Sequence, residues 1–172
     1  MKKDELKKAY WVIAAIGAAM VLSTFVYAGI VEWFKYSNIP TGVKMEPSQV
    51  TTLRVALLVF SAVEFIIIKY IRSAFMSGKI KMKPNPGTLG YANPVGAFTA
   101  VSVIVYALCE SICIYGLVLF LITRDSFNFY IFFAISLVAY AAYFPRYRQL
   151  EEWARGKGLV EQVEVRRETK FE

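Results

Sequence analysis

Four long apolar runs divide the chain, at roughly residues 10–34, 53–71, 95–123 and 127–144. Each run is near or above the ~18 residues that indicate a membrane-spanning helix. Charged residues separate the runs, and Pro, Gly and Asn between the second and the third run indicate a turn-rich, solvated loop. The pattern predicts an all-α, polytopic membrane protein whose four transmembrane helices form one domain, residues 1–145.

The third and fourth runs are separated only by Arg124, Asp125 and Ser126. So short a connection predicts a tight turn between two antiparallel helices. Pro145 follows the fourth run and is expected to end or kink that helix, because proline lacks the backbone N–H that a helix interior needs.

Residues 146–172 form a separate charged segment. Tyr147, Leu150 and Trp153 or Ala154 recur there at helical spacing, which predicts a short amphipathic helix followed by a charged tail. The helix could rest on lipid headgroups through its arginines, or it could dock on a partner.

Lysine and arginine collect at the N-terminus, in the loop between the second and third runs, and after the fourth run. Basic residues near the ends of spans are retained in the cytoplasm, so this distribution predicts that both termini are cytoplasmic. The formal net charge of +7 is explained by this topology and by contact with the bilayer, and nucleic-acid binding is not needed to explain it.

The composition narrows the class of protein further. Apolar residues make up 57% of the chain, against roughly 45–50% in soluble domains, which favours an integral protein of a bacterial or archaeal cytoplasmic membrane. The chain has no histidine, and Cys109 and Cys113 both lie within the third run. We therefore expect no disulfide framework, no metal or other cofactor, and no enzymatic activity.

Two carboxylates lie inside apolar runs: Glu64 in the second and Glu110 in the third. An ionisable group at that depth costs at least ~2.5 kcal/mol, so its presence requires compensation. For Glu64 we expect a packing role, because Ser61 lies one helical turn before it and a local polar contact is a sufficient explanation.

Glu110 has a more polar setting, with Tyr106 one turn before it, Ser111 next to it and Tyr115 just beyond. Burial disfavours the charged form of a carboxyl group, so Glu110 could take up and release a proton with these hydroxyl groups as partners. The same oxygens could also surround a hard cation.

The segment ALCESICIYGLVLFLI, within the third run, resembles the carboxylate helix of subunit c, the proteolipid of rotary ATP synthases. Ala107 and Glu110 match the alanine and the ion-carrying glutamate of that helix, and residues 114–118, Ile-Tyr-Gly-Leu-Val, match the run that follows. The resemblance is confined to this one span. It implies that Glu110 binds a proton or a sodium ion.

In sodium-binding members of that family, a serine directly after the glutamate and a tyrosine contribute oxygen ligands, and Ser111 and Tyr115 match these positions. The next position, a threonine in some of those members, is Ile112, and the second span has no glutamine. The resemblance therefore implies a proton in preference to sodium.

The sequence leaves three functional hypotheses open. The first is a membrane subunit that handles protons through Glu110; the second is a non-catalytic accessory or scaffolding subunit; the third is a small stand-alone transporter. Two acids in mid-bilayer, together with the small-residue faces around Gly17 and Gly116, predict a homo-oligomer or a stable complex with other membrane subunits.

Overall fold

The computed structural model describes residues 3–37, 45–77 and 94–156, and in these residues the only regular structure is helical. The elements are α1 (Lys3–Tyr36), α2 (Pro47–Met76), α3 (Pro94–Thr123), α4 (Ser126–Tyr143) and α5 (Tyr147–Gly156). The first four helices are long and apolar enough to cross a membrane, which confirms the predicted all-α class with four spans.

The first two helices extend beyond the apolar runs that predict them. At the start of α2, Pro47 occupies the first helical position, where a missing N–H costs nothing. The side chain of Gln49 then accepts a hydrogen bond of 3.1 Å from the backbone N–H of Glu46. These local contacts stabilise the polar first turns of α2, which hydropathy alone does not reveal.

The predicted tight turn between α3 and α4 is confirmed. The Asp125 side chain caps α4 by accepting a hydrogen bond of 3.0 Å from the backbone N–H of Phe127. Arg124 turns the chain with a φ of 61°, in the left-handed region that residues other than glycine rarely adopt.

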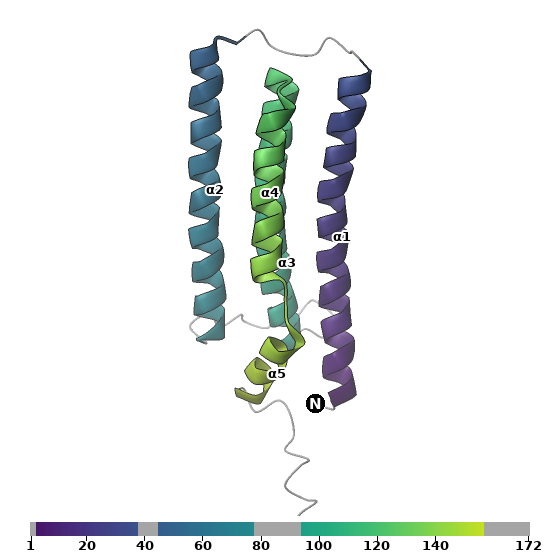
Figure 1. The fold of residues 1–172 in the computed structure, drawn as a ribbon. Coiled ribbons are helices and arrows are strands. Elements are labelled where there is room, and N and C mark those ends of the chain that lie inside the picture. Colours follow the sequence, from purple (N-terminus) through teal and green to yellow (C-terminus); the bar gives the residue numbers. More distant parts are fainter. Residues whose placement is uncertain (1–2, 38–44, 78–93, 157–172) are drawn as a thin grey trace, which may run out of the picture.

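Helix α3 is the centre of the bundle and packs against α1, α2 and α4. Helices α1 and α2 stand on opposite sides of the α3–α4 pair (Figure 1). The start of α1, the end of α2 and helix α5 lie at one end of the bundle, here called the α5 end (Figure 1). The α3–α4 turn lies at the other end, here called the turn end. The predicted loop and tail, residues 78–93 and 157–172, lie outside the described residues.

Two glycines lie against side chains of neighbouring helices. A Cβ atom added at Gly116 would lie 2.7 Å from Cβ of Phe132 on α4. One added at Gly17 on α1 would lie 3.0 Å from the ring of Tyr106 on α3. Both glycines therefore pack against side chains of the same chain.

Helix α5 is amphipathic, as predicted, and it folds back on its own chain. Its apolar residues Leu150, Trp153 and Ala154 are buried. The ring of Trp153 stacks on Phe75 of α2, with ring centres 5.3 Å apart, and lies 5.5 Å from the ring of Phe98 on α3. The apolar face of α5 thus closes the space between α2 and α3 at this end of the bundle.

Candidate functional site

Glu110 projects from α3 toward α1, where two hydroxyl groups meet one of its carboxyl oxygens. Oε1 of Glu110 accepts hydrogen bonds from Oγ of Ser23, at 2.5 Å, and from the OH of Tyr27, at 2.7 Å. Ser23 and Tyr27 are four residues apart on α1, so they share one face of that helix. The side chain of Glu110 is only partly buried.

Glu64 has the same kind of surroundings on the opposite side of α3. Its Oε1 accepts hydrogen bonds from Oγ of Ser111, at 2.9 Å, and from the OH of Tyr115, at 2.6 Å. Glu64 is 8% exposed, and its Oε2 is enclosed without a hydrogen bond from any described residue.

The structure therefore changes the predicted partners of both acids. Ser111 and Tyr115, expected beside Glu110, donate instead to Glu64. The reason is geometric: successive residues of a helix point about 100° apart, so Ser111 faces α2 while its neighbour Glu110 faces α1.

The other two predicted site residues do not contact the acids by hydrogen bonds. The hydroxyl of Tyr106 is buried and has no partner among the described residues, and its ring packs over Gly17. Oγ of Ser61 donates to the backbone carbonyl of Leu57 at 2.9 Å, within its own helix. Tyr106 and Ser61 therefore lie near the two acids in the sequence but form no hydrogen bond with them.

Sequence reasoning missed Ser23 and Tyr27 as site residues. A signal was present, because Ser23 and Tyr27 repeat the Ser-x-x-x-Tyr spacing of Ser111 and Tyr115. That spacing places the two hydroxyl groups on one helix face, one turn apart. Only the packing of the helices decides which acid each pair reaches.

The same spacing recurs in α4, where it binds no acid. Oγ of Ser136 donates to the backbone carbonyl of Cys109 at 2.7 Å, and the OH of Tyr140 donates to that of Tyr106 at 3.1 Å. Both donors and both acceptors are buried. This pair holds α4 against α3 without a group that can change its charge.

In both carboxyl sites the serine hydroxyl lies between two acceptors. Oγ of Ser23 is 2.6 Å from the backbone carbonyl oxygen of Met20 and 2.5 Å from Oε1 of Glu110. Oγ of Ser111 is 2.7 Å from the carbonyl oxygen of Leu108 and 2.9 Å from Oε1 of Glu64. A hydroxyl group carries one proton, so it can donate to only one of its two neighbours at a time.

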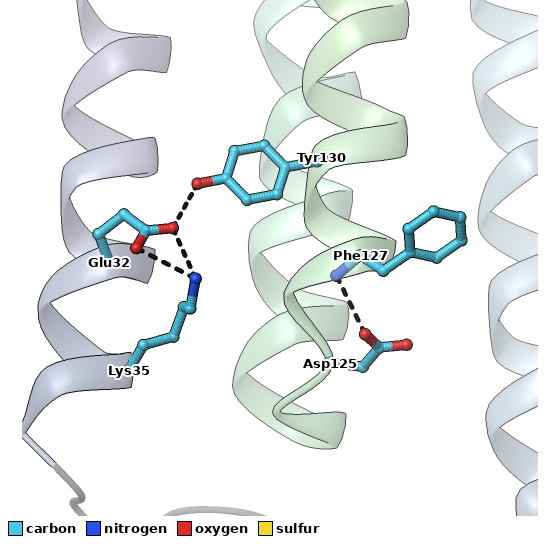
Figure 2. A network of polar contacts seen from close by, with 5 residues as sticks. All are labelled: Glu32, Lys35, Asp125, Phe127 and Tyr130. Atoms are coloured by element: carbon cyan, nitrogen blue, oxygen red, sulfur yellow. Dashed lines mark hydrogen bonds and ion pairs between the residues drawn. The ribbon is translucent and has the colours of Figure 1, made fainter.

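A separate polar network lies at the turn end. Figure 2 shows Tyr130 of α4 pointing toward Glu32 of α1, and its OH donates to Oε1 of Glu32 at 2.5 Å. Nζ of Lys35 also donates to that oxygen, at 3.0 Å. These side chains are solvent-accessible at the end of the bundle, so the network ties α1 to α4 without burying a charge.

Cys109 and Cys113 are buried and unpaired. Within residues 3–37, 45–77 and 94–156, no group of three or more His, Cys, Asp or Glu residues is arranged to hold a metal ion. No family model, no curated protein and no solved structure matches the chain.

Proposed function

We propose that this chain is an integral membrane subunit that takes up and releases protons at Glu110. Its place would be a bacterial or archaeal cytoplasmic membrane. The observation that carries the proposal is the position of Ser23, whose hydroxyl lies between a backbone carbonyl and the carboxyl oxygen of Glu110. Glu64 and Ser111 repeat the arrangement and supply a second proton-binding group.

This arrangement satisfies both protonation states with little rearrangement. When Glu110 is ionised, the hydroxyl groups of Ser23 and Tyr27 both donate to Oε1. When Glu110 is neutral, its own O–H donates to Ser23, whose proton turns to the carbonyl of Met20. The exchange needs only the rotation of one hydroxyl group, so a proton can enter or leave without an unpaired polar group remaining in the bilayer.

A proton suits these sites better than a sodium ion. The described residues supply each carboxyl group with only two side-chain hydroxyl groups. Hard cations are usually surrounded by more oxygen ligands than this. The third span resembles the proteolipid helix, and some sodium-binding members of that family have a threonine where this chain has Ile112. This difference also favours a proton.

The first test is proton movement in vesicles reconstituted with the full chain. Glu110→Gln keeps the size of the side chain and removes the exchangeable proton, so it should abolish proton flux reported by a pH-sensitive dye. Glu32→Gln is the matched control, because Glu32 lies outside the proposed site at the turn end, and it should keep wild-type flux. Full flux through Glu110→Gln would refute the proposal.

The second test is chemical. A hydrophobic carbodiimide reacts with protonated carboxyl groups in apolar surroundings, so it should label Glu110 at low pH and lose this reaction as the pH rises. Tyr27→Phe removes a donor to Oε1 of Glu110 and should change the pH dependence of labelling. Absence of labelling at every pH would contradict the proposed role.

The alternative function is a non-catalytic accessory or scaffolding subunit. It is favoured by Ser136 and Tyr140, which use the same spacing to hold α4 on α3 through backbone carbonyls alone. Under this alternative, Glu110→Gln would lower the stability of the protein and would not change proton flux in vesicles.

The proton-handling proposal also expects a homo-oligomer or other membrane subunits as partners. A strictly monomeric chain in native mass spectrometry would instead favour a small stand-alone transporter.

A further inference from the structure

A shallow hollow opens at the α5 end, between α2, α3 and the corner where α4 meets α5. The hollow is partly open to the outside. Most of the wall is apolar and includes Met76, Val101 and Val105. Polar groups at the hollow include the side chains of Arg72 and Gln149.

Arg72 is a partly buried cation whose described partners are neutral. Its Nη2 donates to Oε1 of Gln149, and its guanidinium lies 5.7 Å from the centre of the Tyr143 ring. No ion pair joins Arg72 to a carboxylate in the part of the chain that the structure describes. A planar guanidinium with free donors beside a hollow is suited to bind a phosphate group.

The position of the hollow indicates where that phosphate comes from. Arg72 lies one turn before the end of α2, a helix that is long and apolar enough to cross the membrane. At such a position a long basic side chain reaches the headgroup layer while its stem lies along apolar surface. The walls formed by Val101 and Val105 continue from Arg72 toward the middle of α3.

We propose that this hollow binds one anionic glycerophospholipid, with the phosphate on Arg72 and the first part of one acyl chain against Val101 and Val105. The amide of Gln149 orients the guanidinium, so α5 takes part in the site. Bound lipid therefore stabilises the contact between α2 and α5.

Native mass spectrometry of the full chain in mild detergent, titrated with phosphatidylglycerol, tests this proposal. Wild-type protein should retain one lipid, and Arg72→Gln should bind it about tenfold more weakly or worse, the loss expected for one charged hydrogen bond. Arg148→Gln is the matched control, because it removes the same charge at the same end from a side chain that is 87% exposed. It should bind as wild type does.

A second variant leaves the charge in place and fills the hollow. Ser102 lines the hollow, and its Oγ donates to the carbonyl of Phe98 in its own helix. Ser102→Phe should therefore block the lipid while helical content, followed by circular dichroism, is unchanged. Equal binding by Arg72→Gln and Arg148→Gln, or undiminished binding by Ser102→Phe, would overturn the proposal. Binding of inorganic phosphate as tight as that of phosphatidylglycerol would also overturn it, because it would show an anion site that does not select lipid.

Discussion

At the scale of single residues, Gly116 of α3 lies against Phe129 and Phe132 of α4. In Gly116→Ala the new Cβ would meet Phe132 at 2.7 Å and the backbone oxygen of Phe129 at 3.0 Å. Overpacking of this kind costs about 1–3 kcal/mol, because backbone cannot move aside as a flexible side chain can. We expect a clear fall in the thermal unfolding midpoint in detergent.

Gly29→Ala is the control for this prediction, since nothing lies within 4 Å of a Cβ atom at that position. Alanine favours a helix over glycine by roughly 0.5–1 kcal/mol, so this variant should be neutral or slightly more stable. Equal destabilisation by the two substitutions would contradict the packing described for α3 and α4.

A second prediction concerns the partners of the two acids. A double-mutant cycle that combines Tyr115→Phe with Glu64→Gln should give a coupling energy of about 0.6 kcal/mol, or up to ~1.7 kcal/mol, as measured for other hydrogen bonds between membrane helices. The cycle of Tyr115→Phe with Glu110→Gln should give a coupling near zero. Unfolding in detergent measures both coupling energies. Coupling of Tyr115 to Glu110 and none to Glu64 would instead support the partners inferred from the sequence.

The positions of the acids could be predicted from sequence, because a glutamate within an apolar run is visible in any hydropathy plot. Their partners could not be predicted. Ser111 is adjacent to Glu110 in the chain, yet helical geometry directs the two side chains to different neighbours. The spacing of Ser23 and Tyr27 marks a polar face of α1, but it does not identify Glu110 as the acid that this face meets.

At the scale of elements, α5 docks partly through Trp153, which is 7% exposed and contacts the rings of Phe75 and Phe98. Trp153→Ala should release α5, since truncation of a buried tryptophan costs about 3–5 kcal/mol. Limited trypsin digestion should then cut within α5, because proteolysis requires local unfolding. Glu152→Ala, at an exposed position, should leave the digestion pattern unchanged.

The helices themselves follow from the apolar runs, and the turn between α3 and α4 follows from its shortness. Two features of the elements needed the structure. The start of α2 depends on Pro47 and Gln49, whose effect is local and polar. The apolar face of α5 could have met lipid, a partner or its own chain, and periodicity cannot distinguish these surfaces.

At the scale of the whole molecule, we predict that the α5 end faces the cytoplasm, because that end holds most of the basic residues that the structure describes: Lys7, Lys8, Arg72, Arg146, Arg148 and Arg155. Ser37 and Ser77 are exposed residues just after α1 and just after α2, so their cysteine variants mark opposite ends. A membrane-impermeant maleimide should label Ser37→Cys in intact cells and Ser77→Cys only after permeabilisation. Cys109 and Cys113 are buried and should stay unlabelled in the folded protein. The opposite pattern would invert the topology.

The central position of α3 has a consequence for how the protein assembles in the bilayer during its synthesis. Helices α1 and α2 leave the ribosome first, yet each packs mainly on α3. Until α3 enters the bilayer, Glu64 lacks Ser111 and Tyr115, and Ser23 lacks Glu110. The first half of the chain therefore inserts before the Glu64 carboxyl group has either of its hydrogen-bond donors. Nascent chains that stop before α3 should be recognised as incomplete and degraded, while assembly should become rapid once α3 is released.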